Sequence, residues 1–310
     1  MLKTKKRIGI SIGDLNGIGL ELALKNHEII SQLVQPLYFV DRELVENGAD
    51  LLKIKVPDNF QTINKIERIF EIKPAEISAE SGLYSFSSFK TAVEFAKNRE
   101  IFGIATLPIN KESWKKAGIK YSGHTSALRD FFQQDAIMLM GAKDLWVALY
   151  TEHISLAEVQ KFIKRESLEK FFRIIARDFK NKFDQIGVLA LNPHAGDGGV
   201  CGNDEPEIEL AINNINRELN INLFSKPLIP DIAFTPRMRE KYKFYIAMYH
   251  DQGLIPLKTL YFDEAINISI NLPILRTSVG HGTAFDIAYK FARELNSKSY
   301  INSIEWFKKF

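Results

Sequence analysis

The stretch LNPHAGDGGVCGNDEPE, Leu191 to Glu207, sets the fold class expected for this chain. It continues an apolar run from residue 186 that has the length and composition of a buried strand. A glycine-rich loop follows, and Asp204 precedes a helical pattern over residues 205–219. His194 stands where the strand ends, and ligands of open α/β sheets bind at the carboxyl ends of the strands. We therefore expect a strand, a flexible loop and a helix, with a histidine at the ligand-binding edge.

Strands alternate with helices along most of the 310 residues, as apolar runs and apolar-periodic segments indicate. Strands are expected at residues 7–13, 36–40, 101–107, 136–140, 146–150, 186–191, around 228, 243–248 and 266–270. Helices are expected at 89–97, 156–163, 168–179, 205–219 and 282–295, and after residue 126 with Ser122 or Thr125 as the cap. The alternation predicts an α/β fold with a mostly parallel sheet covered on both faces. Adjacent strands within 136–150 predict an antiparallel section and a second subdomain, while 42–81 has an irregular pattern.

Composition narrows the class of protein. The chain is 45% apolar and 25% charged, which is ordinary for a globular protein, and its net charge of +3 is too small to argue for nucleic acid. The single cysteine, Cys201, excludes an internal disulfide and fits a reducing compartment. No stretch reaches the length of a membrane span, and the N-terminus leads directly into a strand, unlike a signal peptide. We expect a cytoplasmic protein that binds neither nucleic acid nor membrane.

Three of the six histidines follow apolar runs that predict strands, whereas His27 is expected at the surface. His153 follows WVALYTE, His194 follows VLALNP and His250 follows FYIAMY. Three neutral imidazoles from separate strand ends are a common way to build a catalytic divalent-metal site with open positions. The pattern fits equally well three histidines that are each hydrogen-bonded independently, since no short spacing such as H-x-x-x-H favours a metal.

Cations and polar groups occupy similar positions. Lys258 and Arg276 could hold an anionic group such as phosphate or carboxylate. A solvated charge is the alternative for each, and it is weaker for Arg276, which stands among apolar and small residues. Asp251 directly follows His250 and could orient its imidazole or contact a substrate. The remaining candidates are Lys111, His124, Thr125, Asp231 and Asn267.

Four long motifs carry a resemblance to a known family. They are GHTSAL (123–128), LNPHAGDGG (191–199), AMYHDQGLIPLK (247–258) and NISINLPILRTSVGHGTAFDIA (267–288). Together they resemble the 4-hydroxythreonine-4-phosphate dehydrogenase family of pyridoxal phosphate biosynthesis, and GDLNGIGLE, PINKE and YTEHISL match further segments in order. The chain departs from the family pattern at Leu15, Asn16, Leu20, Asn271 and Gly280, none of which is a candidate ligand.

The resemblance implies a fold similar to isocitrate and isopropylmalate dehydrogenases. Residues 1–310 would form one catalytic chain of two interleaved α/β subdomains around a cleft, with a boundary that the sequence does not set. The chain would form a homodimer with active sites at the interface. The implied metal ligands are His153, His194 and His250. The implied substrate contacts are His124, Thr125, Lys258, Asn267 and Arg276, with Asp231 and Asp251 nearby.

The implied reaction is the oxidation of 4-phosphohydroxy-L-threonine by NAD or NADP, for pyridoxine 5'-phosphate biosynthesis. The β-keto acid formed would lose CO₂ to give 3-amino-2-oxopropyl phosphate. The nucleotide would bind without a Rossmann fingerprint, which agrees with the lack of a G-x-G-x-x-G motif in the turn at Gly13 to Glu21. Lys258 and Lys111 are the candidates for the group that takes the hydroxyl proton, with Asp251 as a further catalytic candidate.

Several alternatives remain open at this point. The metal could be zinc, cobalt, magnesium or manganese. His250 could come from one subunit and the other two histidines from its partner. The substrate could instead be a phosphorylated sugar acid, such as a 4-phosphoerythronate or threonate. A metal-dependent hydrolase would use the same histidines, and a relative of the same fold without redox activity would bind no NAD.

Overall fold

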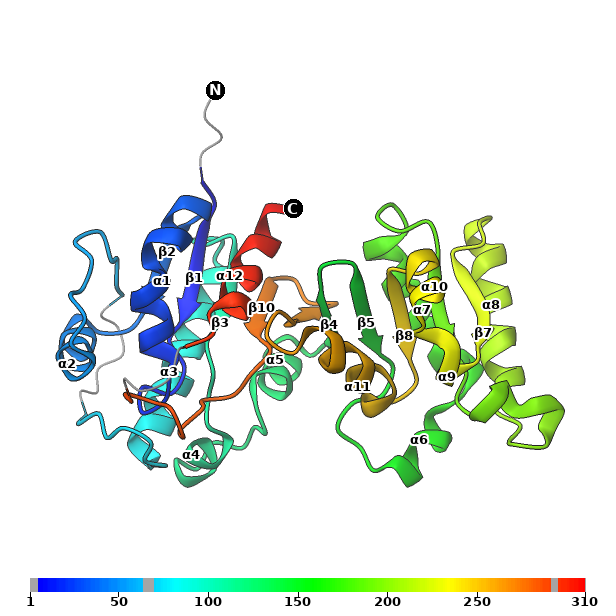
Figure 1. The fold of residues 1–310 in the computed structure, drawn as a ribbon, viewed down its shortest axis with the longest axis horizontal. Coiled ribbons are helices and arrows are strands. Elements are labelled where there is room, and N and C mark those ends of the chain that lie inside the picture. The colour runs from blue at the N-terminus through cyan, green and yellow to red at the C-terminus, as the bar shows by residue number, and fades with distance from the viewer. Residues whose placement is uncertain (1–4, 64–69, 291–294, 310) are drawn as a thin grey trace. The chain divides into compact units, whose positions relative to one another are not determined.

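The structure is a computed structural model that describes residues 5–63, 70–290 and 295–309. The chain divides into two compact units (Figure 1). Unit 1 comprises Met1–Ala136 and Asp263–Phe310, and unit 2 comprises Ile137–Phe262. Both units are mixed α/β structures with mostly parallel pairing and an antiparallel section, which confirms the expected fold class.

The strands described in unit 1 pair in the order β2-β1-β3-β10-β9. The first four are parallel and β9 is antiparallel to β10. Their bounds are β1 Arg7–Ser11, β2 Gln35–Phe39, β3 Gly103–Thr106, β9 Ile266–Ile270 and β10 Leu275–Val279. The helices are α1 Gly19–Leu33, α2 Arg42–Leu52, α3 Ala79–Lys97, α4 Lys111–Lys116, α5 His124–Phe132, α12 Lys298–Glu305 and the short η2 Trp306–Lys309.

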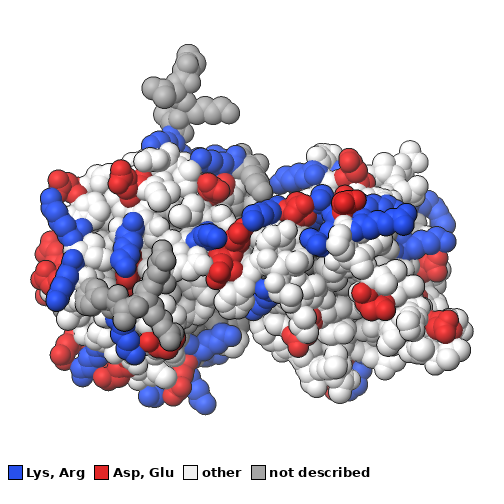
Figure 2. Space-filling model, in the orientation of Figure 1, with Lys and Arg blue, Asp and Glu red and all other residues white. Residues whose placement is uncertain are grey.

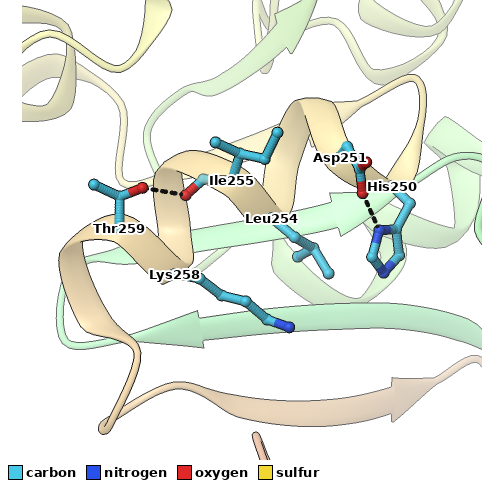
Figure 3. Close-up of a pocket in the computed structure, with 6 residues that line it drawn as sticks. All are labelled: His250, Asp251, Leu254, Ile255, Lys258 and Thr259. Atoms are coloured by element: carbon cyan, nitrogen blue, oxygen red, sulfur yellow. Dashed lines mark hydrogen bonds and ion pairs between the residues drawn. The ribbon is translucent and has the colours of Figure 1, made fainter.

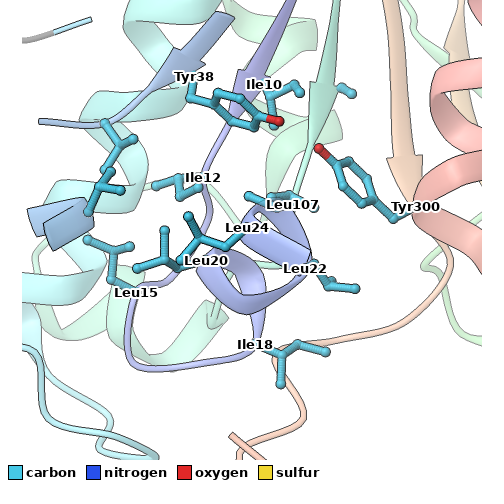
Figure 4. Packing of buried hydrophobic residues seen from close by; sticks show 14 of the residues in the cluster. Ile10, Ile12, Leu15, Ile18, Leu20, Leu22, Leu24, Tyr38, Leu107 and Tyr300 are labelled. Carbon is cyan, nitrogen blue, oxygen red and sulfur yellow. The ribbon is translucent and has the colours of Figure 1, made fainter. Parts of the chain in front are cut away.

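Both faces of the unit 1 sheet are apolar and covered. Successive strand side chains point to opposite faces, so Tyr38 of β2 joins one cluster while Leu37 and Phe39 join another. The first cluster, seen in Figure 4, packs Ile10 of β1 and Tyr38 against α1. Leu20 of α1 is fully buried there. The sheet is therefore a rigid platform for side chains at its strand ends.

The strands described in unit 2 pair in the order β4-β5-β8-β6-β7. β4 and β5 are antiparallel, and the other neighbours are parallel. Their bounds are β4 Ile137–Ala142, β5 Leu145–Leu149, β6 Ile186–Leu189, β7 Phe224–Leu228 and β8 Phe244–Ala247. The helices are α6 Leu156–Phe162, α7 Arg165–Phe179, η1 Pro193–Gly199, α8 Glu205–Leu219, α9 Pro230–Ala233, α10 Pro236–Lys241 and α11 His250–Tyr261.

The helix expected at residues 282–295 is wrong in its described part. Residues 285–289 form turns, with single hydrogen bonds such as that from the Ala288 backbone N–H to the Ala284 carbonyl at 3.1 Å, and residues 282–284 and 290 have no regular structure. Ala284 and Tyr289 have positive φ angles of 45° and 57°, and a right-handed helix cannot continue through them. Residues 291–294 lie outside the described part of the chain.

Other expectations also need correction. Residues 42–81, which have an irregular sequence pattern, contain α2. The cap of α5 is Gly123 rather than Ser122 or Thr125, because the Ser126 hydroxyl accepts from the Gly123 backbone N–H and donates to the Gly123 carbonyl. His27 is buried, with its Nδ1 3.0 Å from the Tyr38 hydroxyl. Within the described chain, no helix combines the length and apolarity needed to cross a bilayer. Lys and Arg are interspersed with Asp and Glu on the face drawn in Figure 2.

Candidate functional site

Three neighbouring parallel strands of unit 2 each lead to one of the candidate metal ligands. β5, β8 and β6 lie side by side, so their carboxyl ends share one edge of the sheet. His153 follows β5 in the connection to α6, His250 opens α11 after β8, and His194 lies in η1 after β6. The topology therefore brings all three histidines to one edge of one unit.

His153 and His250 lie ring to ring, with 5.4 Å between the ring centroids. The Nδ1 atom of His250 is 2.7 Å from Oδ1 of Asp251, and a carboxylate accepts, so Nδ1 carries the proton. That tautomer leaves Nε2 of His250 with a lone pair for a ligand. His153 Nδ1 is 3.8 Å from Oε2 of Glu152. Both members of the pair come from a single chain.

His194 belongs to an unusual segment. Residues 194–198 all have positive φ angles, and the His194 side chain is exposed. Gly196 is required here, because a Cβ at its φ of +81° would lie 2.6 Å from a carboxylate oxygen of Glu205. Glu205 also accepts hydrogen bonds from the Asn192 backbone and side chain at 2.8 and 3.1 Å. The segment is thus anchored to α8 at its base.

The three histidines are not gathered into a finished metal site. Among the residues that the structure describes, no three His, Cys, Asp or Glu side chains lie close enough to hold a metal ion. His153 and His250 form a pair, and His194 projects from the next strand end. Asp231 is exposed on α9, a short helix that packs against η1, so it lies on the same side of unit 2 as His194.

A pocket of about 380 Å³ opens along α11 (Figure 3). His250, Leu254 and Lys258 are spaced at four-residue intervals, which places them on one face of the helix. In Figure 3 the side chains of His250 and Lys258 project from the same side of α11. The lining residues are His250, Asp251, Leu254, Ile255, Lys258 and Thr259. Lys258 and Asp251, two of the candidate catalytic residues, thus share this pocket with His250.

Unit 1 holds a second group of candidate residues, centred on a buried arginine. Arg276 lies in β10 and is 2% exposed. Its Nη2 donates to Thr106 Oγ1 at 2.7 Å, and its Nη1 donates to Ser269 Oγ at 3.2 Å. In the described residues its Nε has no hydrogen-bond partner, and no carboxylate acts on the guanidinium. No strand was expected at Arg276, yet this residue is part of β10.

Burial without a counter-ion is costly for a cation. Burial lowers the pKa of the Arg276 guanidinium from its usual high value to about 9. Arg276 nevertheless remains protonated at neutral pH. Such a cation is stabilised by any anion that can reach it.

His124 completes the polar environment of Arg276. It opens α5, is buried against the rings of Phe89 and Trp114, and has Nδ1 3.3 Å from Arg276 Nη2. Burial, reinforced by the charges of Arg276 and Lys111, holds the pKa of His124 well below its usual range, so the imidazole is neutral. An arginine can only donate, so Nδ1 accepts and Nε2 carries the proton. Nε2 is buried with no acceptor among the described residues.

The other predicted residues of unit 1 surround this pair. Lys111, the first residue of α4, is exposed, and its charge acts on His124. Thr125 is the second residue of α5 and is half-buried. Asn267 lies two positions before Ser269 on β9, so both side chains share the face of the sheet that carries Arg276. In the described chain the Asn267 Oδ1 is buried without a hydrogen-bond partner.

The two residues that hold Arg276, Thr106 and Ser269, were not among the residues predicted from the sequence. Thr106 and Ser269 come from strands far apart in the sequence. Thr106 lies outside the quoted motifs, and Ser269 lies inside the motif at 267–288 but was not among the candidate residues. One signal was present, because Asn267 and Ser269 are polar residues that alternate with isoleucines in an otherwise apolar strand. Alternation of this kind indicates a polar strip on one face of a sheet.

Comparisons with known proteins agree along the chain. The family model of the pyridoxal phosphate biosynthetic protein PdxA matches residues 32–307. A 4-hydroxythreonine-4-phosphate dehydrogenase from Sulfurimonas denitrificans is 49% identical, over 97% of this chain and 97% of that relative. Another from Campylobacter fetus subsp. fetus is 48% identical, over 97% of this chain and 96% of that relative. The crystal structure of a 4-hydroxythreonine-4-phosphate dehydrogenase from Klebsiella pneumoniae matches with a TM-score of 0.82 at 29% identity, over 99% of this chain and 98% of that one. The chain therefore belongs to the PdxA family of pyridoxal phosphate biosynthetic proteins and is a dehydrogenase.

Proposed function

We propose that this chain oxidises the secondary alcohol of 4-phosphohydroxy-L-threonine to a β-keto acid, which then loses CO₂. The names of its relatives supply the substrate, and the observation that carries the proposal is the buried, unpaired guanidinium of Arg276. A buried cation of this kind favours a substrate that brings an anion. The phosphate of a phosphorylated hydroxy amino acid meets that requirement.

Arg276 and His124, together with the residues around them, are proposed to bind the phosphate. Arg276 Nε and His124 Nε2 are buried donors without acceptors in the described chain, and unmade hydrogen bonds of this kind are expensive. Phosphate oxygens would satisfy both. Lys111 adds a second positive charge, and the Thr125 hydroxyl and the backbone at the start of α5 add further donors. Asn267 is proposed to contact the same substrate through its unpaired amide oxygen.

The three histidines are proposed to hold one divalent cation, either zinc, cobalt, magnesium or manganese. The donor set fits such an ion, because His153 and His250 are already paired and Asp251 fixes the His250 tautomer that leaves Nε2 available. His194 would be the third ligand, reached by a movement of its loop. When bound, the cation would favour loss of the hydroxyl proton and stabilise charge on the substrate oxygen.

Residues of the chain are proposed to handle the proton and the position of the substrate. Lys258 is the better placed of the two candidate bases, because it shares a pocket with His250, whereas Lys111 is exposed beside His124. Asp251 would keep His250 oriented, and Asp231 would contact substrate from α9 beside η1. NAD or NADP is proposed as the acceptor of the hydride, in line with the dehydrogenase relatives.

The chain is further proposed to act as a homodimer with its active site at the interface. Two exposed apolar side chains support a partner: Ile255, which lines the pocket that contains His250, is 63% exposed, and Phe262, which follows α11, is 65% exposed. Large apolar side chains grouped near a site are typical of a covered surface. Sedimentation of the active enzyme should give a dimer. A monomer with full activity at the same concentration would contradict this part of the proposal.

Turnover decides the proposed function. Purified protein is stripped of metal with a chelator and supplied with 4-phosphohydroxy-L-threonine and NAD, with and without added Zn²⁺, Co²⁺, Mg²⁺ or Mn²⁺. We expect NADH to form only when a metal is present. Faster turnover of 4-phosphoerythronate or 4-phosphothreonate would reassign the substrate to a sugar acid. Product without NADH would indicate a hydrolase.

A further inference from the structure

One row of polar side chains crosses four strands of the unit 1 sheet. Directly paired residues carry it from β1 through β3 and β10 to β9, in the order Ser11, Thr106, Ser278 and Asn267. Ser11 and Thr106 are the last residues of β1 and β3, and β1, β3 and β10 are parallel. The row therefore lies at the carboxyl ends of these three strands, where ligands of open α/β sheets bind.

One half of this row has its hydrogen bonds made within the chain, and the other half does not. On β1 the serine shares a hydrogen bond of 3.3 Å with Ser88, and on β3 Thr106 Oγ1 accepts from Arg276 Nη2 at 2.7 Å. Among the described residues, the Ser278 hydroxyl has no hydrogen-bond partner, and Asn267 Oδ1 is buried without one. Polar groups left open in this way call for a partner from outside the chain.

The charged end of Arg276 lies toward Ser278. Arg276 is two positions before Ser278, so the two side chains share one face of β10. The guanidinium reaches along this face, because its Nη2 donates to Thr106, which stands directly opposite Ser278 on β3. Neighbouring strands lie about 4.8 Å apart. An anion that the guanidinium attracts on this face would therefore be within reach of the Ser278 hydroxyl.

The neighbouring residue, Thr277, shows that an unmade hydrogen bond alone does not indicate a ligand. Its Oγ1 is also buried without a partner among the described residues. Thr277 points to the opposite face of β10, however, where Leu275 and Val279 pack in an apolar cluster. Thr277 is 0% exposed, whereas Ser278 is 8% exposed. Only Ser278 combines an open hydroxyl with access from outside and a nearby buried cation.

We propose that Ser278 is a further substrate-binding residue, whose hydroxyl donates a hydrogen bond to an oxygen of the anion held by Arg276. The inference rests on the proposed function, since it takes this anion to be the phosphate of the substrate. A serine hydroxyl can rotate to donate, and ionised phosphate oxygens only accept. Such a hydrogen bond is stronger than one between neutral groups. Donors from β10 and from α5, which contains His124, would then contact one phosphate.

The test compares Ser278→Ala with Thr277→Val, since each removes one hydroxyl from β10. The rise of Tm with the concentration of inorganic phosphate gives the affinity of each full-length protein for the anion. We expect Ser278→Ala to bind phosphate about tenfold more weakly than the wild type, and Thr277→Val to bind it equally well. With NAD and metal, Ser278→Ala should raise KM for 4-phosphohydroxy-L-threonine and leave kcat nearly unchanged, because the bond to phosphate does not change during the reaction.

A second variant tests the position of Ser278 beside Arg276. Ser278→Asp would place a carboxylate next to the guanidinium, where it would pair with the cation and repel phosphate, so phosphate should no longer raise the Tm. A phosphate response that persists in Ser278→Asp, wild-type affinity in Ser278→Ala, or an equal loss in Thr277→Val would overturn the role of Ser278 alone. A wild-type protein whose Tm does not respond to phosphate would overturn the phosphate site as well.

Discussion

Arg276 with His124 in unit 1 and the three histidines in unit 2 differ in how firmly the protein holds them before a ligand binds. Arg276 and His124 are buried in unit 1, and the hydrogen bonds that the guanidinium donates to Thr106 and Ser269 hold it in place before any ligand arrives. His153 and His194 are exposed on connections of unit 2. The difference has a physical cause. A lone buried cation must be held by the protein, whereas neutral imidazoles have no attraction for one another until a cation joins them.

The largest effect should follow from removing a histidine. His153→Ala or His250→Ala should weaken Co²⁺ binding by more than about a hundredfold, because loss of a ligand exceeds the effect of losing a residue that orients one. Turnover of 4-phosphohydroxy-L-threonine should fall with it. Titration of metal-free protein and the rate of NADH formation measure the two effects.

Mixing the two inactive variants tests whether one chain supplies both ligands. The rings lie 5.4 Å apart in a single chain, so each site of a mixed dimer would keep one lesion and activity should stay lost. If His250 came from one subunit and His153 from the other, one site of the mixed dimer would carry no lesion and activity would return. Recovery toward half of the wild-type activity, once mixed dimers are shown to form, would restore that division.

A smaller effect, of opposite sign for stability and activity, should follow from Arg276→Met. Replacing an uncompensated buried charge with an apolar side chain should raise the free energy of unfolding by about 1 kcal/mol or more. Inorganic phosphate should raise the Tm of the wild type and leave that of the variant unchanged. Arg129→Met is the control, because Arg129 bonds the Ala136 carbonyl at 2.7 Å and has no proposed ligand. If inorganic phosphate still raises the Tm of Arg276→Met, the anion does not bind at Arg276.

The smallest effect concerns pH. Burial lowers the pKa of both His124 and His27, so the folded protein resists protonating them. Their contribution to stability is complete above the unfolded pKa of about 6.5 and is lost as the pH falls below it, at up to about 1.4 kcal/mol per pH unit for each. Urea unfolding at neutral and mildly acidic pH should show this loss, and His124→Gln should reduce it. Identical pH dependence in that variant and the wild type would contradict a neutral, buried His124.

Much of the fold could be predicted from the sequence. Buried strands such as β9 and the long helix α8 have clear apolar patterns, and their bounds agree with those expected. α2 was missed because its helical pattern contains Asn47 and Gly48 among charges, although Leu44 and Leu52 are buried on one side. α11 was missed because Gly253 and Pro256 interrupt its pattern.

The sequence named candidate residues for the site, but it did not give their arrangement or the partners of Arg276. The motifs place His153, His194 and His250 at strand ends, and the topology then shows that these strands are neighbours in one unit. Nothing local in the sequence pairs Arg276 with His124, which is 152 positions away. The consequence that matters most, a cation buried without a counter-ion, depends on tertiary packing alone.

The most direct test of the account is the preference of the enzyme for a phosphorylated substrate. kcat/KM is measured with NAD and saturating metal for 4-phosphohydroxy-L-threonine and for 4-hydroxy-L-threonine, in the wild type and in Arg276→Met. We predict that the wild type prefers the phosphorylated compound by at least about a hundredfold, or about 2.7 kcal/mol, and that the variant loses most of this preference. A variant that is less active on both compounds but keeps the wild-type preference would show that the phosphate is bound elsewhere, and would contradict the role assigned to Arg276.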